Sequence, residues 1–306
     1  MSDLDLIPNH PAAREVPLST VAALLRSGAR ALEGHSESPR LDAELLLGSL
    51  LKLPRSSLVA HDRDPVPADR AQAYASLIDR RRSGSPVAYL TGIREFWSLE
   101  LEITPAVLVP RPETELTVEL ALELLPPCRT PPGAPYAVLD LGTGSGAIAL
   151  ALAAERPEWR LTGIDISPTA LEVAARNSRK LGLTHIDWRL GAWFEPVAGC
   201  RFDLIVANPP YVAAADPALV KLAAEPALAL ASGPTGLEAL TAIVREAASH
   251  LLPQGRLILE HGCDQAPDVA QLLERHGFTG VRSYPDFSGK PRVTLGAVHS
   301  THQEPL

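Results

Sequence analysis

The chain has 306 residues, of which 46% are hydrophobic, and its 28 Lys and Arg against 36 Asp and Glu give a formal net charge of −8. This length and apolar content suffice for one large domain or two unequal ones with a buried core, and they exclude a disordered chain. No apolar run reaches the roughly 18 residues that a membrane-spanning helix needs, and the first residues are acidic where a signal peptide would be basic, so we expect a soluble, cytoplasmic protein.

The cysteines Cys128, Cys200 and Cys263 lie far apart, with no CxxC pair and no histidine at ligand spacing. A disulfide framework and a metal site are therefore not expected. The acidic balance also argues against a large duplex nucleic-acid surface, since such surfaces rest on many Lys and Arg contacts to phosphate.

Residues 1–18 combine prolines with polar residues and are predicted to form a flexible leader. Apolar residues at helical spacing then predict helices over 19–34, 40–51 and 68–82, which would form a small bundle. In the second of these helices we expect Leu41, Leu45 and Leu46 to share the buried face.

The periodicity changes to two over residues 86–104, which predicts a β-hairpin that turns at Thr91-Gly92. A helix should follow from about Pro110, because prolines are favoured at the first helical position. Five prolines within 126–135 then indicate a linker or rigid turn.

Beyond this linker, apolar runs alternate with helical patterns, which predicts a parallel β-sheet covered by helices on both faces. The predicted strands are 136–141, 160–166, 185–190, 203–208 and 256–262, and the predicted helices lie near 146–155, 168–181, 236–252 and 265–276. The last two strand-like runs have no helix between them, so we expect an antiparallel edge pair before a disordered tail at 298–306.

The sequence VLDLGTGSGAIAL places three glycines between a buried strand and a helix. Glycine there permits positive φ and lets a ligand approach the backbone. Asp165 lies 23 residues after Gly142, at the end of the next strand, where a carboxylate can accept both hydroxyls of an adenosine ribose. Together these features predict an adenosine cofactor, but they leave a nicotinamide cofactor open, because the loop also fits a G-x-G-x-x-A pattern.

The most specific feature is DLIVANPPY, which ends a buried strand with Asn208-Pro209-Pro210-Tyr211. The Asn208 side-chain oxygen and the Pro209 carbonyl can accept the two N–H hydrogens of a planar NH2 group and leave its lone pair free. Tyr211 could then pack over the substrate plane or favour a nearby sulfonium. This pattern favours methyl transfer from S-adenosylmethionine to a weakly basic nitrogen such as an amide, a reaction that depends on positioning rather than on a strong base.

Trp193, after the third strand, could stack on an adenine or could equally be a core aromatic. Arg176 and Asn177 are expected on a solvated helix face.

In this order, the segments LTGIREFWSLELEITPAVLVPRPETE, VLDLGTGSGAIALALA, GIDISPTALEVAARN, GAWF, FDLIVANPPY and LILEHG resemble the protein-(glutamine-N5) methyltransferases of bacterial peptide chain release factors, the PrmC or HemK family. The resemblance covers about residues 20 to 297. It implies an α/β fold: a Rossmann-like, seven-stranded class I S-adenosylmethionine-dependent methyltransferase domain, preceded by a small helical bundle and a β-hairpin linker. The implied regions are a leader at 1–18, a substrate-docking domain at 19–84, a hairpin connector at 85–110, the methyltransferase domain at 111–297 and a tail at 298–306.

The resemblance also implies roles for individual residues. The cofactor would be held by Gly142, Thr143, Gly144, Ser145, Gly146, Asp165, Trp193 and Asn208. Asn208, Pro209, Pro210 and Tyr211 would bind the glutamine of a Gly-Gly-Gln loop, with Asn208, Pro209 and Tyr211 as the catalytic set, and no metal is expected. Arg111 and Glu113 would support the site. Ala192 replaces an acidic residue common in relatives, and the His261 of Glu260-His261-Gly262 replaces an isoleucine, a change expected to be harmless.

The expected partner is therefore a release factor, bound by a monomeric enzyme. Four alternatives remain at this point: a ribosomal-protein glutamine methyltransferase, an adenine-N6 methyltransferase, a nicotinamide-dependent oxidoreductase, and a release-factor-binding module without catalysis. An adenine-N6 methyltransferase is disfavoured because residues 101–306 carry 16 Lys and Arg against 23 Asp and Glu, a net charge of −7.

Overall fold

The structure is a computed structural model that describes residues 19–126 and 133–299. The predicted leader, Cys128, most of the proline-rich linker and the end of the predicted tail lie outside these residues. The chain divides into two compact units, Met1–Ser83 and Gly84–Leu306. None of the helices in the described ranges is long and apolar enough to cross a membrane.

The first unit is a bundle of three α-helices, as the sequence predicts. Its elements are β1 (Ser19–Thr20), α1 (Val21–Leu32), α2 (Pro39–Leu51), the 3-10 helix η1 (Arg55–Ser57), β2 (Pro65–Val66) and α3 (Ala68–Arg82). The side chain of Thr20 caps α1 by accepting a hydrogen bond from the Ala23 N–H at 3.2 Å. The predicted buried face of α2 is wrong in part, because Leu46 and Leu47 are fully buried whereas Leu41 and Leu45 are exposed.

The second unit begins with the short helix α4 (Val87–Thr91) and the hairpin β3 (Ile93–Phe96) and β4 (Leu99–Glu102). The predicted turn at Thr91-Gly92 is wrong: Gly92 ends α4 in the left-handed conformation, and the hairpin turns at Trp97-Ser98, which have φ of 52° and 60°. Neither tryptophan nor serine readily adopts the positive φ that a two-residue turn of this kind requires, which asparagine and glycine adopt more easily. Contacts outside the hairpin hold this turn, because the Trp97 N–H and indole N–H donate to Glu115 and Glu155 at 2.8 and 2.9 Å.

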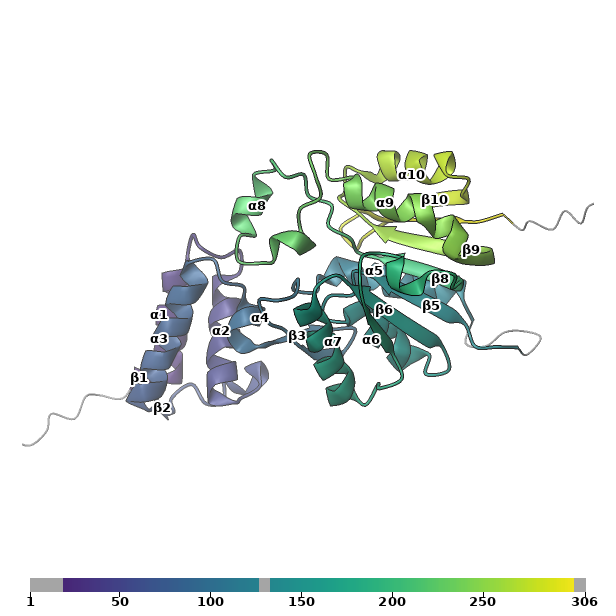
Figure 1. Cartoon of the computed structure of the whole chain (residues 1–306). Coiled ribbons are helices and arrows are strands. Elements are labelled where there is room, and N and C mark those ends of the chain that lie inside the picture. Colours follow the sequence, from purple (N-terminus) through teal and green to yellow (C-terminus); the bar gives the residue numbers. More distant parts are fainter. Residues whose placement is uncertain (1–18, 127–132, 300–306) are drawn as a thin grey trace, which may run out of the picture. The chain divides into compact units, whose positions relative to one another are not determined.

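A mixed seven-stranded sheet forms the centre of the second unit (Figure 1), with the strand order β10-β11-β9-β8-β5-β6-β7. The strands β7, β6, β5, β8 and β9 are parallel, and β11 is antiparallel to both β9 and β10. The predicted α/β fold with a terminal antiparallel pair is thereby confirmed. The strands are β5 (Ala137–Leu141), β6 (Arg160–Asp165), β7 (Asp187–Leu190), β8 (Phe202–Ala207), β9 (Leu251–Glu260), β10 (Thr279–Pro285) and β11 (Pro291–Ala297).

Helices cover both faces of this sheet, and alternation along the strands assigns each residue to a face. Leu204 and Val206 of β8 belong to the core under α5, α6 and α7, whereas Ile205 and Ala207 belong to the core under α9 and α10. The helices are η2 (Pro112–Thr114), α5 (Glu115–Leu124), α6 (Ala147–Glu155), α7 (Pro168–Leu181), η3 (Glu195–Val197), α8 (Ala218–Lys221), η4 (Ala227–Ala229), α9 (Glu238–Ala247), η5 (Ala248–His250) and α10 (Ala266–Arg275).

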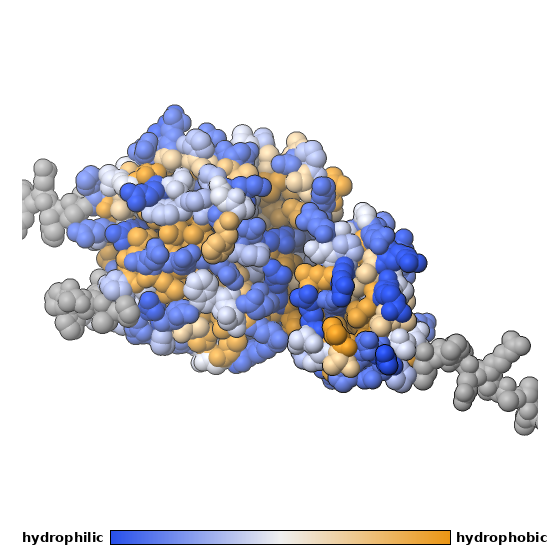
Figure 2. Space-filling view, turned by 180° about the vertical axis from the view of Figure 1, so that it is seen from behind, coloured by the Kyte–Doolittle hydropathy of each residue, from blue (hydrophilic) through white to orange (hydrophobic). Residues whose placement is uncertain are grey.

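The predicted helix over 236–252 is too long, because the chain enters β9 at Leu251, which pairs with Phe202 of β8. At the surface, hydrophobic patches alternate with hydrophilic residues on the face seen in Figure 2. Large exposed apolar side chains include Ile166 and Leu228, which take part in the site described next.

Candidate active site

A cavity of about 360 Å³ opens where β5, β6 and β8 end. This is the point at which strand order reverses, since the chain runs outward from β5 through β6 to β7 and then from β8 to β9 on the other side. Open α/β sheets bind ligands at such switch points, and the volume suits a small molecule. The cavity is lined by residues 106–108, 110, 114, 142–145, 147, 148, 164–167, 170, 191–193, 208, 210, 226, 228 and 229.

Most of the residues predicted from the sequence meet in this cavity. Its lining includes Gly142, Thr143, Gly144, Ser145, Asp165, Trp193, Asn208 and Pro210. Gly146, Pro209 and Tyr211 are absent from the lining residues within the described part of the chain.

The glycine loop after β5 is held by backbone contacts to the neighbouring strand. The N–H groups of Gly142 and Thr143 both donate to the Ile164 carbonyl at 2.9 Å. Gly144 has a φ of 56°, and a Cβ placed on it would meet nothing closer than 4.0 Å, so its backbone faces open space. Gly146 differs, because a Cβ there would lie 3.0 Å from Leu150 and 3.1 Å from Trp188. Gly146 therefore serves helix packing.

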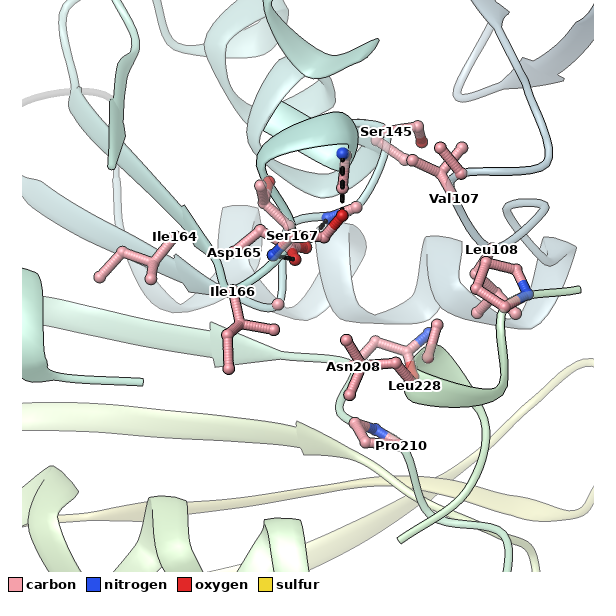
Figure 3. Close-up of a pocket in the computed structure, with 18 of the residues that line it drawn as sticks. Val107, Leu108, Ser145, Ile164, Asp165, Ile166, Ser167, Asn208, Pro210 and Leu228 are labelled. Atoms are coloured by element: carbon pink, nitrogen blue, oxygen red, sulfur yellow. Dashed lines mark hydrogen bonds between the residues drawn. The ribbon is translucent and has the colours of Figure 1, made fainter. Parts of the chain in front are cut away.

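Asp165 stands at the end of β6 and faces this loop (Figure 3). Its two carboxylate oxygens accept hydrogen bonds from the N–H groups of Gly144 at 2.8 Å and Ser167 at 2.9 Å. Burial raises the pKa of Asp165, and the surrounding backbone N–H groups oppose this shift. A carboxylate offers about four acceptor positions, so Asp165 keeps capacity for ligand hydroxyls.

A second carboxyl, Asp140, lies beneath the loop and is 1% exposed. The Thr143 hydroxyl donates to Asp140 at 2.6 Å. Burial raises the pKa of Asp140 to about 7, against the lowering effect of Thr143 and of the Ala149 N–H at the start of α6. Asp140 thus ties the loop to its helix and does not line the cavity.

Trp193 and Ile166 form apolar walls beside the loop. Trp193 has a φ of 45°, unusual for a large side chain, and a Cβ on Gly142 would lie 3.9 Å from its ring. Ile166 is 54% exposed although it lines the cavity. A flat apolar group could be contacted by these two side chains.

Asn208 follows β8 at the other end of the cavity, and its Nδ2 donates to the Thr114 Oγ1 at 3.2 Å. Figure 3 shows Asn208 and Pro210 across the cavity from Ser145 and Val107. Two prolines after Asn208 end the pairing of β8, because proline cannot donate to a sheet. The Asn208 side chain is thereby placed at the sheet edge.

Tyr211 is not among the residues that line the cavity. Its hydroxyl donates to Glu260 Oε1 at 3.4 Å, and its carbonyl accepts from Gln265 Nε2 at 3.0 Å. Its ring packs against the core of the sheet face under α9 and α10, and burial raises the pKa of its hydroxyl.

Two wall segments were not predicted. Residues from 106–110 and from 226–229 line the cavity, and an ion pair between Arg111 and Glu225 joins the two segments. Glu225 is buried and also accepts the Val109 N–H at 3.1 Å. The second segment belongs to 212–236, a mostly irregular, alanine-rich stretch whose prolines interrupt any helical or strand periodicity.

Asn177 corrects another expectation, since it is fully buried rather than solvated. Its Oδ1 accepts from the Glu102 N–H at 2.6 Å, and its Nδ2 donates to the carbonyls of Glu102 and Ser145 at 3.0 Å. Its neighbour Arg176 pairs with the Glu102 carboxylate at 2.8 Å. Asn177 therefore joins the hairpin to the glycine loop. Its position on a buried face was detectable only from tertiary contacts.

The strand order, the glycine loop and the carboxylate after the next strand define a class I methyltransferase fold and site. Residues 134–279 match the family model described as a methyltransferase domain, and residues 23–92 match the PrmC N-terminal domain. The protein is therefore a methyltransferase, which excludes the nicotinamide reading.

Curated relatives specify the family. The chain is 43% identical over 265 residues to the release factor glutamine methyltransferase of Salmonella typhimurium, covering 85% of this chain and 93% of that one. It is 44% identical over 281 residues to the protein of the same name from Pseudomonas aeruginosa, covering 91% and 99%. The chain belongs to the release factor glutamine methyltransferase family.

Solved structures agree with the fold. A 16S rRNA methyltransferase of Thermus thermophilus, in complex with AdoMet and guanosine, is similar with a TM-score of 0.50 and 22% identity, over 68% of this chain and 50% of that one.

Proposed function

We propose that this protein methylates the side-chain amide nitrogen, N5, of the glutamine in the Gly-Gly-Gln loop of peptide chain release factors, with S-adenosylmethionine as methyl donor. The names of its relatives support the substrate. The observation that carries the proposal is the placement of Asn208. Its NH2 group donates a hydrogen bond to the Thr114 hydroxyl, so its Oδ1 is left to accept a hydrogen bond at the cavity.

The cavity fits an adenosine cofactor. Asp165 keeps free acceptor positions beside a loop whose backbone meets open space, and Trp193 and Ile166 add apolar walls. The residues proposed to hold the cofactor are Gly142, Thr143, Gly144, Ser145, Gly146, Asp165, Trp193 and Asn208, with Gly146 acting through the loop's shape. When bound, S-adenosylmethionine supplies a methyl group on a positively charged sulfur and leaves as S-adenosylhomocysteine.

At the Asn208 end, the substrate is proposed to present a planar NH2 group. Asn208 Oδ1 and the Pro209 carbonyl would accept its two N–H hydrogens, which directs the nitrogen lone pair to the third side. Pro210 lines the cavity beside them. Among the described lining residues only Asp165 is ionisable, and it sits at the cofactor end. The site therefore suits catalysis by positioning rather than by a strong base.

Tyr211 contributes to this proposal as a support of the Asn-Pro-Pro turn, through its contacts to Glu260 and Gln265. A direct contact of its ring with the substrate stays a prediction, as do docking of the release factor by the residues 19–84, a monomeric state and a cytoplasmic location.

Incubation of the enzyme with radiolabelled S-adenosylmethionine and a purified bacterial release factor tests the proposal. Label should appear on the release factor and should be lost when the glutamine of its Gly-Gly-Gln loop is replaced by alanine. The same reaction with ribosomal protein or with adenine-containing DNA should give no label. Transfer to either of these, and none to the release factor, would overturn the proposal in favour of the corresponding alternative.

A further inference from the structure

Thr114 lies between Asn208 and Glu260, two residues far apart in sequence. It ends η2, is 4% exposed, and lines the cavity next to Asn208. Its hydroxyl accepts the Asn208 Nδ2 hydrogen at 3.2 Å. The Thr114 side chain is thus buried at the proposed reacting end of the cavity, outside the Asn-Pro-Pro-Tyr motif.

Glu260 ends β9 and is 1% exposed. The Tyr211 hydroxyl donates to Glu260 Oε1 at 3.4 Å. Burial raises the pKa of Glu260, whereas the neighbouring Thr114 hydroxyl and the charge of Arg292 favour its carboxylate form. The buried Oε2 of Glu260 has no hydrogen-bond partner among the described residues, so it is an acceptor available to the hydrogen of the neighbouring Thr114 hydroxyl.

The donor and acceptor roles of these groups then determine the orientation of the Asn208 side-chain amide. A hydroxyl has a single hydrogen, and when Thr114 gives that hydrogen to Glu260 it can only accept from Asn208. The Asn208 NH2 group must then face Thr114, and its oxygen must face the cavity. The reverse orientation would set an NH2 group against the NH2 group of the substrate, donor against donor.

We infer that Thr114, backed by Glu260, is a positioning residue that holds the Asn208 oxygen toward the substrate amide. This inference rests on the proposed function, because it assigns the reason why Asn208 can accept from an NH2 group. It adds Thr114 and Glu260 to the site, two residues that are far in sequence from the Asn-Pro-Pro-Tyr motif.

The substitution Thr114→Val tests it, because valine keeps the shape and removes the hydroxyl. We expect kcat for release-factor methylation to fall about 10-fold or more, with the KM for the release factor and the Kd for the cofactor changed less than about 2-fold. Thr114→Ser should restore most of kcat. In an Asn208→Ala background, Thr114→Val should have no further effect on kcat, because the group that it positions is gone.

Thr117→Val is the matched control. Thr117 lies one turn further on, is fully buried, and its hydroxyl has no hydrogen-bond partner among the described residues. The Thr117→Val substitution should leave kcat unchanged, and thermal melting should show that each variant is folded. Thr114→Ala gives the same test if the valine variant lacks a native melting transition. The inference would be overturned by an unchanged kcat in Thr114→Val, or by an equal loss of kcat when Thr114→Val is added to Asn208→Ala. Failure of the wild-type enzyme to label the release factor would instead overturn the proposed function.

Discussion

The two ends of the cavity are built from different kinds of contact. At the glycine-loop end, backbone N–H groups of Gly144 and Ser167 hold Asp165, and all of these residues lie within one βαβ stretch. At the other end, Asn208 depends on a side-chain hydrogen bond to Thr114, which is 94 residues away in sequence. The first arrangement is local and is suited to holding a cofactor. The second is assembled by the tertiary fold and orients a single amide.

The glycine-loop end should therefore determine cofactor affinity, and the Asn208 end should determine turnover. A substitution at the Asn208 end should lower kcat and leave the cofactor Kd nearly unchanged, whereas a substitution at the glycine-loop end should raise the cofactor Kd and leave kcat nearly unchanged.

Asn208→Ala should lower kcat by about 100-fold or more, because it removes an acceptor that orients the reacting nitrogen. The cofactor Kd should change less than about 3-fold. Steady-state methylation kinetics and a calorimetric titration with the cofactor measure the two quantities on the same preparation. Wild-type turnover in this variant would remove Asn208 from the proposed chemistry.

Asp165→Ala should show the reverse pattern. Cofactor binding should weaken by about 2 kcal/mol, the scale of hydrogen bonds to a charged group, while kcat at saturating cofactor stays within about 3-fold of wild type. Asp165→Asn, which keeps one acceptor oxygen, should lie between the alanine variant and wild type in the same titration. A wild-type Kd in Asp165→Ala would contradict the role of the glycine-loop end.

A buried carboxyl at each end should make stability depend on pH. Burial raises the pKa of both Asp140 and Glu260 to about 7, above their ordinary values of 3.8 and 4.5. Between these values the folded state binds more protons than the unfolded state, so the free energy of unfolding falls as pH rises through 7. From pH 6 to pH 8 each carboxyl should account for a loss of about 1 kcal/mol.

Urea unfolding of the wild type, Asp140→Asn and Glu260→Gln at several pH values checks this expectation. Each variant should show a shallower decline than the wild type over that range. Curves parallel to the wild-type curve would show that the substituted carboxyl keeps an ordinary pKa in the folded protein.

The same contrast explains how much could be predicted from the sequence. The glycine loop and Asp165 were recognisable because their contacts lie within a strand, a turn and a helix that are adjacent in sequence. Asn208 was recognisable because two prolines directly after a buried strand leave few structural interpretations. The order of strands and helices followed from periodicity for similar local reasons.

Residues whose roles depend on distant partners could not be predicted. Thr114 stands in a segment for which the family resemblance implied supporting roles of Arg111 and Glu113, yet Thr114 is the residue that contacts Asn208. Asn177 appeared solvated because its two partners, Glu102 and Ser145, come from other elements. The hairpin turn at Trp97-Ser98 likewise depends on glutamates from two helices, in addition to Glu95 of the hairpin itself.

The most direct test of the account is to locate the transferred methyl group on the release factor. After reaction with the wild-type enzyme, fragment-ion mass spectrometry of the peptide with the Gly-Gly-Gln loop should place one methyl group on the side-chain nitrogen of its glutamine, and the Asn208→Ala enzyme should leave that peptide unmodified. A methyl group on any other residue, or full modification by Asn208→Ala, would contradict the claim that the Asn208 end of the cavity positions a glutamine amide for methylation.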